Sequence, residues 1–265
     1  MTFPLALALK LLFIAGAAMM VLMFVLWLIH LKTNNAAVVD FGWALGLAQF
    51  AVIYAALGNG YLPRRILIGA IAGIWGLRLA THLLFDRVIG QPEEGRYQQL
   101  RKEWGGNIKL KFLFFFEFQA LLDVLLSLPF LLVCLNPQPR LSWLEYAGAG
   151  LAAISIIGEG VADRQLKQFK ANPANKGRTC QVGLWNYSRH PNYFFEWLIW
   201  MAYFVFALAS PYGYITLVCP ALMLYFLYRV TGIPATEAQA LRSRGDEYRR
   251  YQQTTSAFVP WFKKA

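Results

Sequence analysis

Three features of the sequence predict an all-α fold, a polytopic membrane protein with a seven-transmembrane-helix bundle. Hydrophobic residues make up 58% of the 265 residues, more than the roughly 45–50% of a soluble domain. The mean hydropathy is +0.42. Seven segments approach the length of about 20 apolar residues that crosses a bilayer as a helix: 5–30, 39–57, 65–85, 112–135, 143–162, 193–209 and 213–231.

The first and sixth segments need separate arguments. Segment 5–30 carries Lys10 near its start, as a signal peptide would. No small-residue cleavage site with a polar mature start follows it, so we expect it to remain as a helix. Segment 193–209 is short, and we expect it to gain a turn from the loop before it through Pro191, because a proline suits the first turn of a helix.

Positive charge is concentrated in alternate loops. Twenty of the 25 Lys and Arg residues lie in the loop after the first segment, in 87–111, in 164–189 and from Arg229 onward, against three in the other loops. Basic loops stay in the cytoplasm during insertion, so we expect the N-terminus outside and the C-terminus in the cytoplasm. Two explanations of this basic face remain open. Its charges orient the chain during insertion and attract anionic lipid, or they bind an anionic ligand.

The chain is expected to form one domain over 1–265, because it has no long linker and no fixed-period repeat. The two long cytoplasmic loops and the tail are rich in Trp, Tyr and Arg, whereas disordered segments lack aromatic residues. We therefore expect them to fold as a cap over the bundle. Residues 235–251 predict an amphipathic helix, with Thr236 and Gln239 as a capping box.

The sequence argues against several kinds of site. Cys134, Cys180 and Cys219 show no disulfide or metal spacing, and the three histidines form no HxxxH pattern, so we expect no metal. No GxGxxG or GxxxxGK[ST] motif is present. A nucleotide would therefore have to bind in the helical bundle itself.

Several ionisable residues fall within or at the edge of the apolar segments. A charge near the centre of such a helix costs about 2.5–3.5 kcal/mol, so these residues should pair with one another or line a polar chamber. Arg78 with His82, and Glu159 with Asp163, are each four residues apart and share a helix face. The residues of interest are Asp40, Arg78, His82, Glu117, Asp123, Glu159, Asp163 and Glu196.

The stretch 183–196, GLWNYSRHPNYFFE, places polar groups at the start of a membrane helix. Asn192 and Glu196 are four apart and share one face, which would suit the carboxamide of a nicotinamide. Arg and Lys side chains bind phosphate, and the nearby loops supply Arg87, Arg96, Lys170, Arg178, Arg189 and Arg229.

With its flanking motifs, this stretch resembles the bacterial branch of the steroid 5α-reductase family. The flanking motifs are Asp163-Arg164-Gln165-Leu166, 175–178 (NKGR), 231–237 (TGIPATE) and 248–251 (YRRY). The resemblance is strongest over 160–262 and continues more weakly back to Asp40. The core RHPNY is less specific, because membrane isoprenylcysteine and phospholipid methyltransferases share its RHP element.

The resemblance implies an enzyme of the bacterial inner (cytoplasmic) membrane that uses NADPH to reduce the C4–C5 double bond of a 3-oxo-Δ4 steroid. Hydride goes to C5, an acid polarises the C3 carbonyl, and a proton adds at C4. The substrate would be a steroid or similar flat lipid entering from the bilayer, with no nucleic acid and no protein partner.

In such enzymes the cytoplasmic loops and the inner ends of the last four helices hold the cofactor in a capped cavity, here about residues 86–265. The positions that match the family are Asn192, Glu196, Asp163, Arg178, Arg229 and Arg96, and Asp86 stands where the animal enzymes have Asn. Further candidates from the same motifs are Lys170, Arg189, His190, Glu237 and Tyr248.

The residues expected to bind the steroid match the family less well than those expected to bind the cofactor. The animal enzymes grip the ketone with a Glu and a Tyr, and the corresponding positions here are Asp40 and Trp75. Asp40 could act as an acid if burial favours its neutral form. Trp75 offers an N–H donor but no proton to deliver. Tyr54 and His82 are the fallback candidates.

The alternative function is a membrane methyltransferase that uses S-adenosylmethionine. This cofactor carries no phosphate and has a net positive charge, so the many basic residues near Asn192 favour NADPH. Methyltransferases of this type also tend to pair Glu residues on the final helix, whereas Ala238 follows Glu237 here.

Overall fold

The described residues are helical. A computed structural model describes residues 3–230 and 232–263, and within them there is no strand, only a single bridge between Ser188 and Ser256. The all-α prediction is confirmed. Among the described residues, five helices are long and apolar enough to cross a membrane, or six if a pair bent by 40° forms one span. Several apolar helices of this kind indicate a membrane protein.

The predicted count of seven spans is not confirmed. The helix over the sixth predicted segment, α8, runs only from Pro191 to Ala207, 17 residues. It does begin at Pro191, as expected. Predicted segment 112–135 is two helices, because Pro129 lies in the first turn of the second one and a proline there interrupts the hydrogen bonds of the first.

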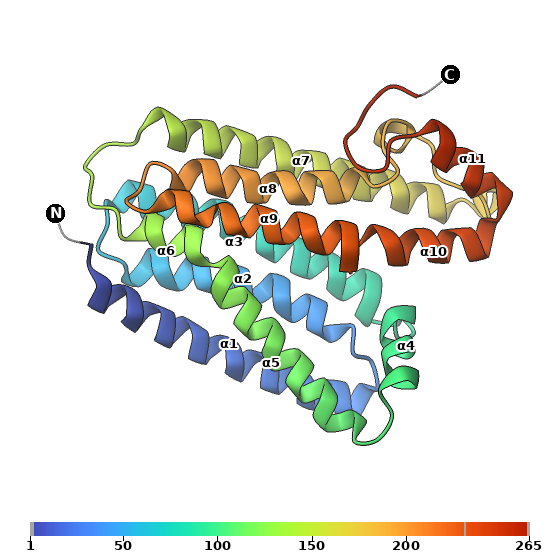
Figure 1. The fold of residues 1–265 in the computed structure, drawn as a ribbon, viewed down its shortest axis with the longest axis horizontal. Coiled ribbons are helices and arrows are strands. Elements are labelled where there is room, and N and C mark those ends of the chain that lie inside the picture. Colours follow the sequence, from blue (N-terminus) through green and yellow to red (C-terminus); the bar gives the residue numbers. More distant parts are fainter. Residues whose placement is uncertain (1–2, 231, 264–265) are drawn as a thin grey trace. The chain divides into compact units, whose positions relative to one another are not determined.

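Figure 1 shows the helices in chain order. The long ones are α1 Leu5–Thr33, α2 Val38–Leu57, α3 Leu62–Leu83, α5 Ile108–Leu126, α7 Trp143–Ala171 and α8 Pro191–Ala207. The short ones are α4 Gly95–Trp104, α6 Leu128–Cys134, α9 Val218–Tyr225, α10 Ile233–Arg244 and α11 Asp246–Thr254. The remaining helical segments are π-helical in η1 Leu84–Val88 and η5 Phe226–Val230, and 3₁₀ in η2 Pro173–Asn175, η3 Gly183–Asn186 and η4 Gly213–Leu217.

The chain forms two compact units. The first holds Met1–Tyr146 and Phe206–Thr216, and the second holds Ala147–Val205 and Leu217–Ala265. The set of cofactor candidates is thereby divided, because Arg96 and Asp86 belong to the first unit and the rest to the second. The single domain expected over 1–265 stays a prediction.

Small residues let the helices of the first unit approach closely. Helix α2 packs against α1, α3 and α5 (Figure 1). A Cβ atom on Gly76 of α3 would lie 2.8 Å from the carbonyl oxygen of Ala44, and one on Gly42 would collide with Leu26 of α1. Without side chains at these positions the backbones come together, which is the usual way that membrane helices pack.

The segment between α3 and α5 folds onto the loop that joins α1 to α2. Glu93 accepts a hydrogen bond from the backbone N–H of Ala36 at 2.8 Å and pairs with Arg101 at 2.7 Å. The Arg101 guanidinium also lies 4.8 Å from the ring of Phe112. The segment between α3 and α5 is therefore held by an ion pair and hydrogen bonds.

Helices α7, α8 and α9 belong mainly to the second unit. Gly158 of α7 faces the ring of Phe195 of α8, and Trp197 of α8 donates a hydrogen bond to the Pro220 carbonyl of α9 at 3.1 Å. The predicted helix over 235–251 is interrupted at Gly245, whose φ of 53° leaves the helical region. The expected capping box is absent, because α10 begins earlier, with Gly232 as its N-cap and no side-chain cap.

Candidate functional site

The stretch 183–196 is fixed to α7 at its start. Gly183 has a φ of 54°, a conformation that suits glycine. Gln165 accepts a hydrogen bond from the Leu184 N–H at 2.9 Å. The indole of Trp185 donates to the Ala162 carbonyl, also at 2.9 Å. These bonds hold the loop on the helix before it.

The C-terminal segment, residues 255–262, lies along the same loop on its other side. The N–H of Arg189 donates to the Ser256 carbonyl at 2.9 Å, and the Ser188 hydroxyl donates to the Phe258 carbonyl at 2.7 Å. The N–H of Trp261 donates to the Tyr187 carbonyl at 2.9 Å. The loop that leads into α8 is thus held between two parts of the chain far apart in sequence.

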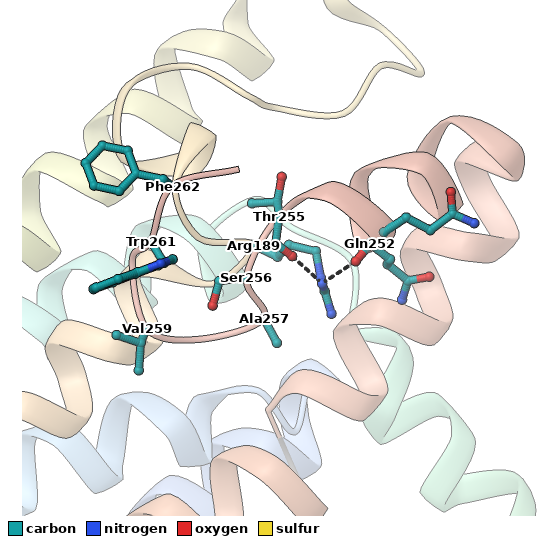
Figure 2. Close-up of a pocket in the computed structure, with 9 residues that line it drawn as sticks. Arg189, Gln252, Thr255, Ser256, Ala257, Val259, Trp261 and Phe262 are labelled. Carbon is teal, nitrogen blue, oxygen red and sulfur yellow. Dashed lines mark hydrogen bonds between the residues drawn. The ribbon is translucent and has the colours of Figure 1, made fainter. Parts of the chain in front are cut away.

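The side chain of Arg189 is occupied by groups of this unit. Its Nε lies 2.6 Å from a carboxylate oxygen of Glu237. Its Nη1 donates to the carbonyls of Gln252 at 3.0 Å and Thr255 at 2.6 Å, the two dashed lines of Figure 2. Arg189 was expected to bind phosphate, but its charge is neutralised by Glu237, so a structural role fits it better.

His190, Tyr248 and Gln252 complete this network around Glu237. His190 Nε2 lies 3.2 Å from Glu237, and the Tyr248 hydroxyl and the Gln252 amide donate to the same carboxylate at 3.4 and 2.7 Å. Burial lowers the pKa of His190 below its ordinary value, although the carboxylate opposes this. Burial raises the pKa of Tyr248. Four cofactor candidates therefore bond mainly to one another.

Asn192 and Glu196 lie on the first turns of α8, immediately after this network. Both are half-buried, and their spacing of four places them on one face of the helix. Asp163 is half-buried on α7. Because His190 and Arg189 are fixed, the helix start that carries Asn192 is fixed as well.

Three basic candidates have no carboxylate partner in the part of the chain that the structure describes. Lys170, Arg178 and Arg229 are exposed, and none of them forms an ion pair within residues 3–230 and 232–263. Unlike Arg189, they keep their full charge available for an anionic ligand.

A cavity of about 400 Å³ opens beside the C-terminal segment (Figure 2). Arg189 and polar residues line one side of it, while Trp261 and Phe262 lie on the other. Neither Asn192 nor Glu196 lines it. The complete lining is Arg189, Gln252, Gln253, Thr255, Ser256, Ala257, Val259, Trp261 and Phe262. The cofactor cavity predicted around Asn192 is thus not confirmed.

In the first unit, Asp40 is held by three side chains of the segment 87–97. It pairs with Arg87 at 3.1 Å and with Arg96, and it accepts a hydrogen bond from the Tyr97 hydroxyl at 2.7 Å. Two guanidinium groups stabilise the ionised carboxylate, whereas the role of an acid requires the neutral form. Burial raises the pKa of Tyr97 well above its ordinary value.

The other steroid candidates lie at different places in the first unit. The buried indole of Trp75 has its ring 6.1 Å from that of Trp43. The Tyr54 hydroxyl is 3.1 Å from the Ser127 hydroxyl. Asp40 and Tyr54 are separated by 14 residues of α2, about 21 Å along a helix, so one ligand atom cannot touch both. His82 is half-buried near the end of α3, and Asp86 is exposed in η1.

Sequence reasoning missed two members of these clusters. Tyr97 was not singled out, although the pattern Gly95-Arg96-Tyr97 contained it. Gln252 was also missed, since nothing in the local sequence distinguishes it from Gln253. Only the fold shows that one glutamine faces Glu237.

The family model described as "Protein of unknown function (DUF1295)" matches residues 26–255. The chain is also similar to the "Uncharacterized protein C594.04c" of Schizosaccharomyces pombe, with 28% identity over 216 residues. That match covers 70% of this chain and 62% of the relative, so the chain spans less than two thirds of the curated protein it matches. No solved structure matches the chain.

Proposed function

The chain belongs to the DUF1295 family, a family of unknown function associated with steroid 5α-reductase-like membrane proteins, and from that premise we propose that it is an NADPH-dependent reductase of enone lipids. The reaction is reduction of the C4–C5 double bond of a 3-oxo-Δ4 steroid or a similar flat lipid. We place the enzyme in the bacterial inner membrane, with the N-terminus outside and with α8 as a seventh span.

One observation supports this proposal above the others: an amide and a carboxylate share a face at a helix start that is fixed on two sides. The preceding residues, Arg189 and His190, are bonded to Glu237, and the loop is bonded to α7 and to the C-terminal segment. A nicotinamide carboxamide has a donor and an acceptor. Asn192 can supply both, and Glu196 can accept a second hydrogen bond.

The donor set of the second unit fits a dinucleotide. When bound, NADPH supplies a hydride to the substrate. Lys170, Arg178 and Arg229 would hold its phosphates, because these exposed cations have no carboxylate partner among the described residues. Asn192 and Glu196 would orient the nicotinamide ring. Asp163, on α7, would accept hydrogen bonds from hydroxyl groups.

Four of the expected ligands take a different role in this proposal. Arg189, His190, Glu237 and Tyr248 position the start of α8 and do not touch the cofactor, because their polar atoms already bond to one another. A fixed helix start reduces the cost of ordering the site when the cofactor binds.

The first test uses purified protein in detergent with NADPH and progesterone, followed by the absorbance of the reduced nicotinamide. We expect NADPH to be oxidised and a 5α-reduced 3-oxosteroid to form. A parallel sample holds S-adenosylmethionine. Its consumption, with NADPH unchanged, would support the methyltransferase function and contradict the reductase.

Variants then locate the cofactor. Asn192→Ala and Glu196→Ala should abolish NADPH binding in a folded protein, and Arg178→Ala should raise the KM for NADPH about tenfold, since a charged hydrogen bond contributes about 1.5–3 kcal/mol. The matched control is Arg140→Ala, which removes an exposed positive charge from the first unit. Normal turnover in both Asn192→Ala and Glu196→Ala would end the assignment.

A further inference from the structure

Asp123 is a buried carboxyl group without a polar partner. It lies on α5 with 0% of its surface exposed, and neither of its side-chain oxygens has a hydrogen-bond partner among the described residues. A Cβ atom on Gly46 of α2 would lie 2.8 Å from Asp123 Oδ2, and the same position is in contact with Met19 of α1. The carboxyl group is thus enclosed by three helices.

Two other acids of the first unit, one fully buried and one half-buried, have cationic partners. Glu145 pairs with Arg64, and Asp40 pairs with Arg87 and Arg96. Asp123 has neither a cation nor a donor among the described residues, and ionisation in such surroundings is opposed by the full loss of hydration. The environment therefore stabilises Asp123 as the neutral carboxylic acid, whose O–H is a hydrogen-bond donor.

Asp123 is part of a polar seam between α2 and α5, formed by Asp123, Ser127 and Tyr54. Asp123 and Ser127 are four apart, at the end of α5, and both are fully buried, so they share a face. The Ser127 hydroxyl lies 3.1 Å from the Tyr54 hydroxyl of α2. Gly46 of the same helix lies beside the Asp123 carboxyl group. The seam therefore follows both helices in the apolar part of the unit.

A second unsatisfied donor lies near this seam. Gln49 is three residues after Gly46 on α2, and its Nε2 is buried without a hydrogen-bond partner in the described part of the chain. Residues three apart lie on neighbouring positions of one helix face. A ligand that enters here would supply the acceptor that both groups lack among the described residues.

The space beside Asp123 is filled by Met19, which is itself fully buried. Gly46 contributes no side chain there, and the unbranched methionine side chain fills the irregular gap and changes rotamer easily. Rotation of the Met19 side chain would open room for one edge of a flat apolar ligand, which would bring a polar oxygen to the carboxyl group.

We propose that Asp123 donates a hydrogen bond from its carboxylic acid to the carbonyl oxygen of the lipid substrate and so polarises the enone, with Gln49 as the second donor. This rests on the proposed reduction, and it assigns to Asp123 the role that Asp40, held ionised by two arginines, does not fit. The proton stays on Asp123 and no covalent bond forms. A fixed donor in a dry site stabilises charge that develops on a carbonyl oxygen.

Steady-state kinetics with NADPH and progesterone give the first test. Asp123→Ala should lower kcat about 100-fold or more, the scale seen when one such donor is removed, with the KM for NADPH unchanged. Asp123→Asn, which keeps an N–H donor of similar shape, should retain part of the activity. Glu117→Gln, which changes a half-buried acid on the same helix, should leave kcat unchanged.

The second test needs no turnover. Infrared difference spectra of the protein with progesterone and without NADPH should show the C=O band of a protonated carboxyl group moving to lower frequency, and Asp123→Asn should remove that band. If Asp123→Ala does not fold, Asp123→Asn and this band decide the matter. Wild-type kcat in the folded Asp123 variants, or a band that does not move, overturns the role of Asp123 and leaves the reductase standing. A shifted band in a protein that never oxidises NADPH overturns the reductase instead.

Discussion

At the residue scale, buried polar side chains in the described structure include fully satisfied groups and groups left without any partner. Arg64 is the satisfied case: it is 1% exposed, pairs with the fully buried Glu145, and donates to the carbonyls of Asn136 at 2.9 Å, Gln138 at 2.7 Å and Arg140 at 2.7 Å. All five of its N–H groups are used. A buried charge of this kind orders a loop, whereas an unsatisfied group such as Asp123 is available to a ligand.

The satisfied case predicts a large loss of stability on truncation. Arg64→Ala leaves Glu145 charged and buried and frees three carbonyls, so unfolding should become easier by about 3–5 kcal/mol. Thermal unfolding in detergent measures it. Arg140→Ala, which removes an exposed side chain and keeps the carbonyl, should stay within about 0.5 kcal/mol of the original protein. Equal loss in both variants would contradict a structural role for the Arg64 guanidinium.

At the scale of elements, the C-terminal segment is part of the fold of the second unit. Its Phe258 is 3% exposed and packs against Phe194 at 5.6 Å, Trp197 at 5.9 Å and Tyr228 at 5.1 Å between ring centroids. The same segment bonds to the loop before α8. The tail therefore supports the start of α8, where Asn192 and Glu196 lie.

This arrangement predicts different effects from two phenylalanines of one segment. Phe258→Ala removes a buried ring and should destabilise the protein by about 3–5 kcal/mol, with weaker NADPH binding because the helix start loses its support. Phe262→Ala changes a ring that is 75% exposed and should have little effect on stability. Thermal unfolding and NADPH titration in detergent measure both. If Phe258→Ala unfolds like the original protein, the segment is only a surface attachment.

At the scale of the whole molecule, the proposed orientation in the membrane follows from charge and apolar length. Five or six helices can cross it by length and composition. Arg64 is one of three basic residues in the loops expected outside. It is buried against Glu145, so it is not an exposed charge in those loops.

Cysteine labelling tests the proposed orientation. In a background with Cys134, Cys180 and Cys219 replaced by Ala, Asn59→Cys, in the loop between α2 and α3, should react with a membrane-impermeant maleimide in intact bacterial cells. Lys102→Cys, on α4, should react only after the membrane is opened. Both positions are exposed. The reverse pattern would invert the topology, and labelling of both in intact cells would contradict a span at α3.

Much of the fold could be predicted from local patterns, and the errors have local causes. Apolar runs predicted the long helices correctly. A long segment without charges in lipid has few other ways to satisfy its backbone hydrogen bonds. The bend at Pro129 and the break at Gly245 were missed although both residues are helix breakers, since nearby residues favour helix. For the site, the sequence identified the motif around Arg189-His190-Pro191. It did not predict which partners the side chains of this motif would bond to.

By itself, the sequence determined an all-helical membrane protein, the basic character of alternate loops and the placement of Asn192 and Glu196 on one helix face, because all three follow from composition and from spacing along one helix. Only the tertiary structure decided which charges are neutralised by a partner. Arg189 pairs with Glu237 from another helix, Asp40 pairs with arginines 47 and 56 residues away, and Asp123 has no partner among the described residues. Such partners come together through packing between segments that are distant in sequence. Hydrophobic periodicity does not predict which polar side chains will be in contact.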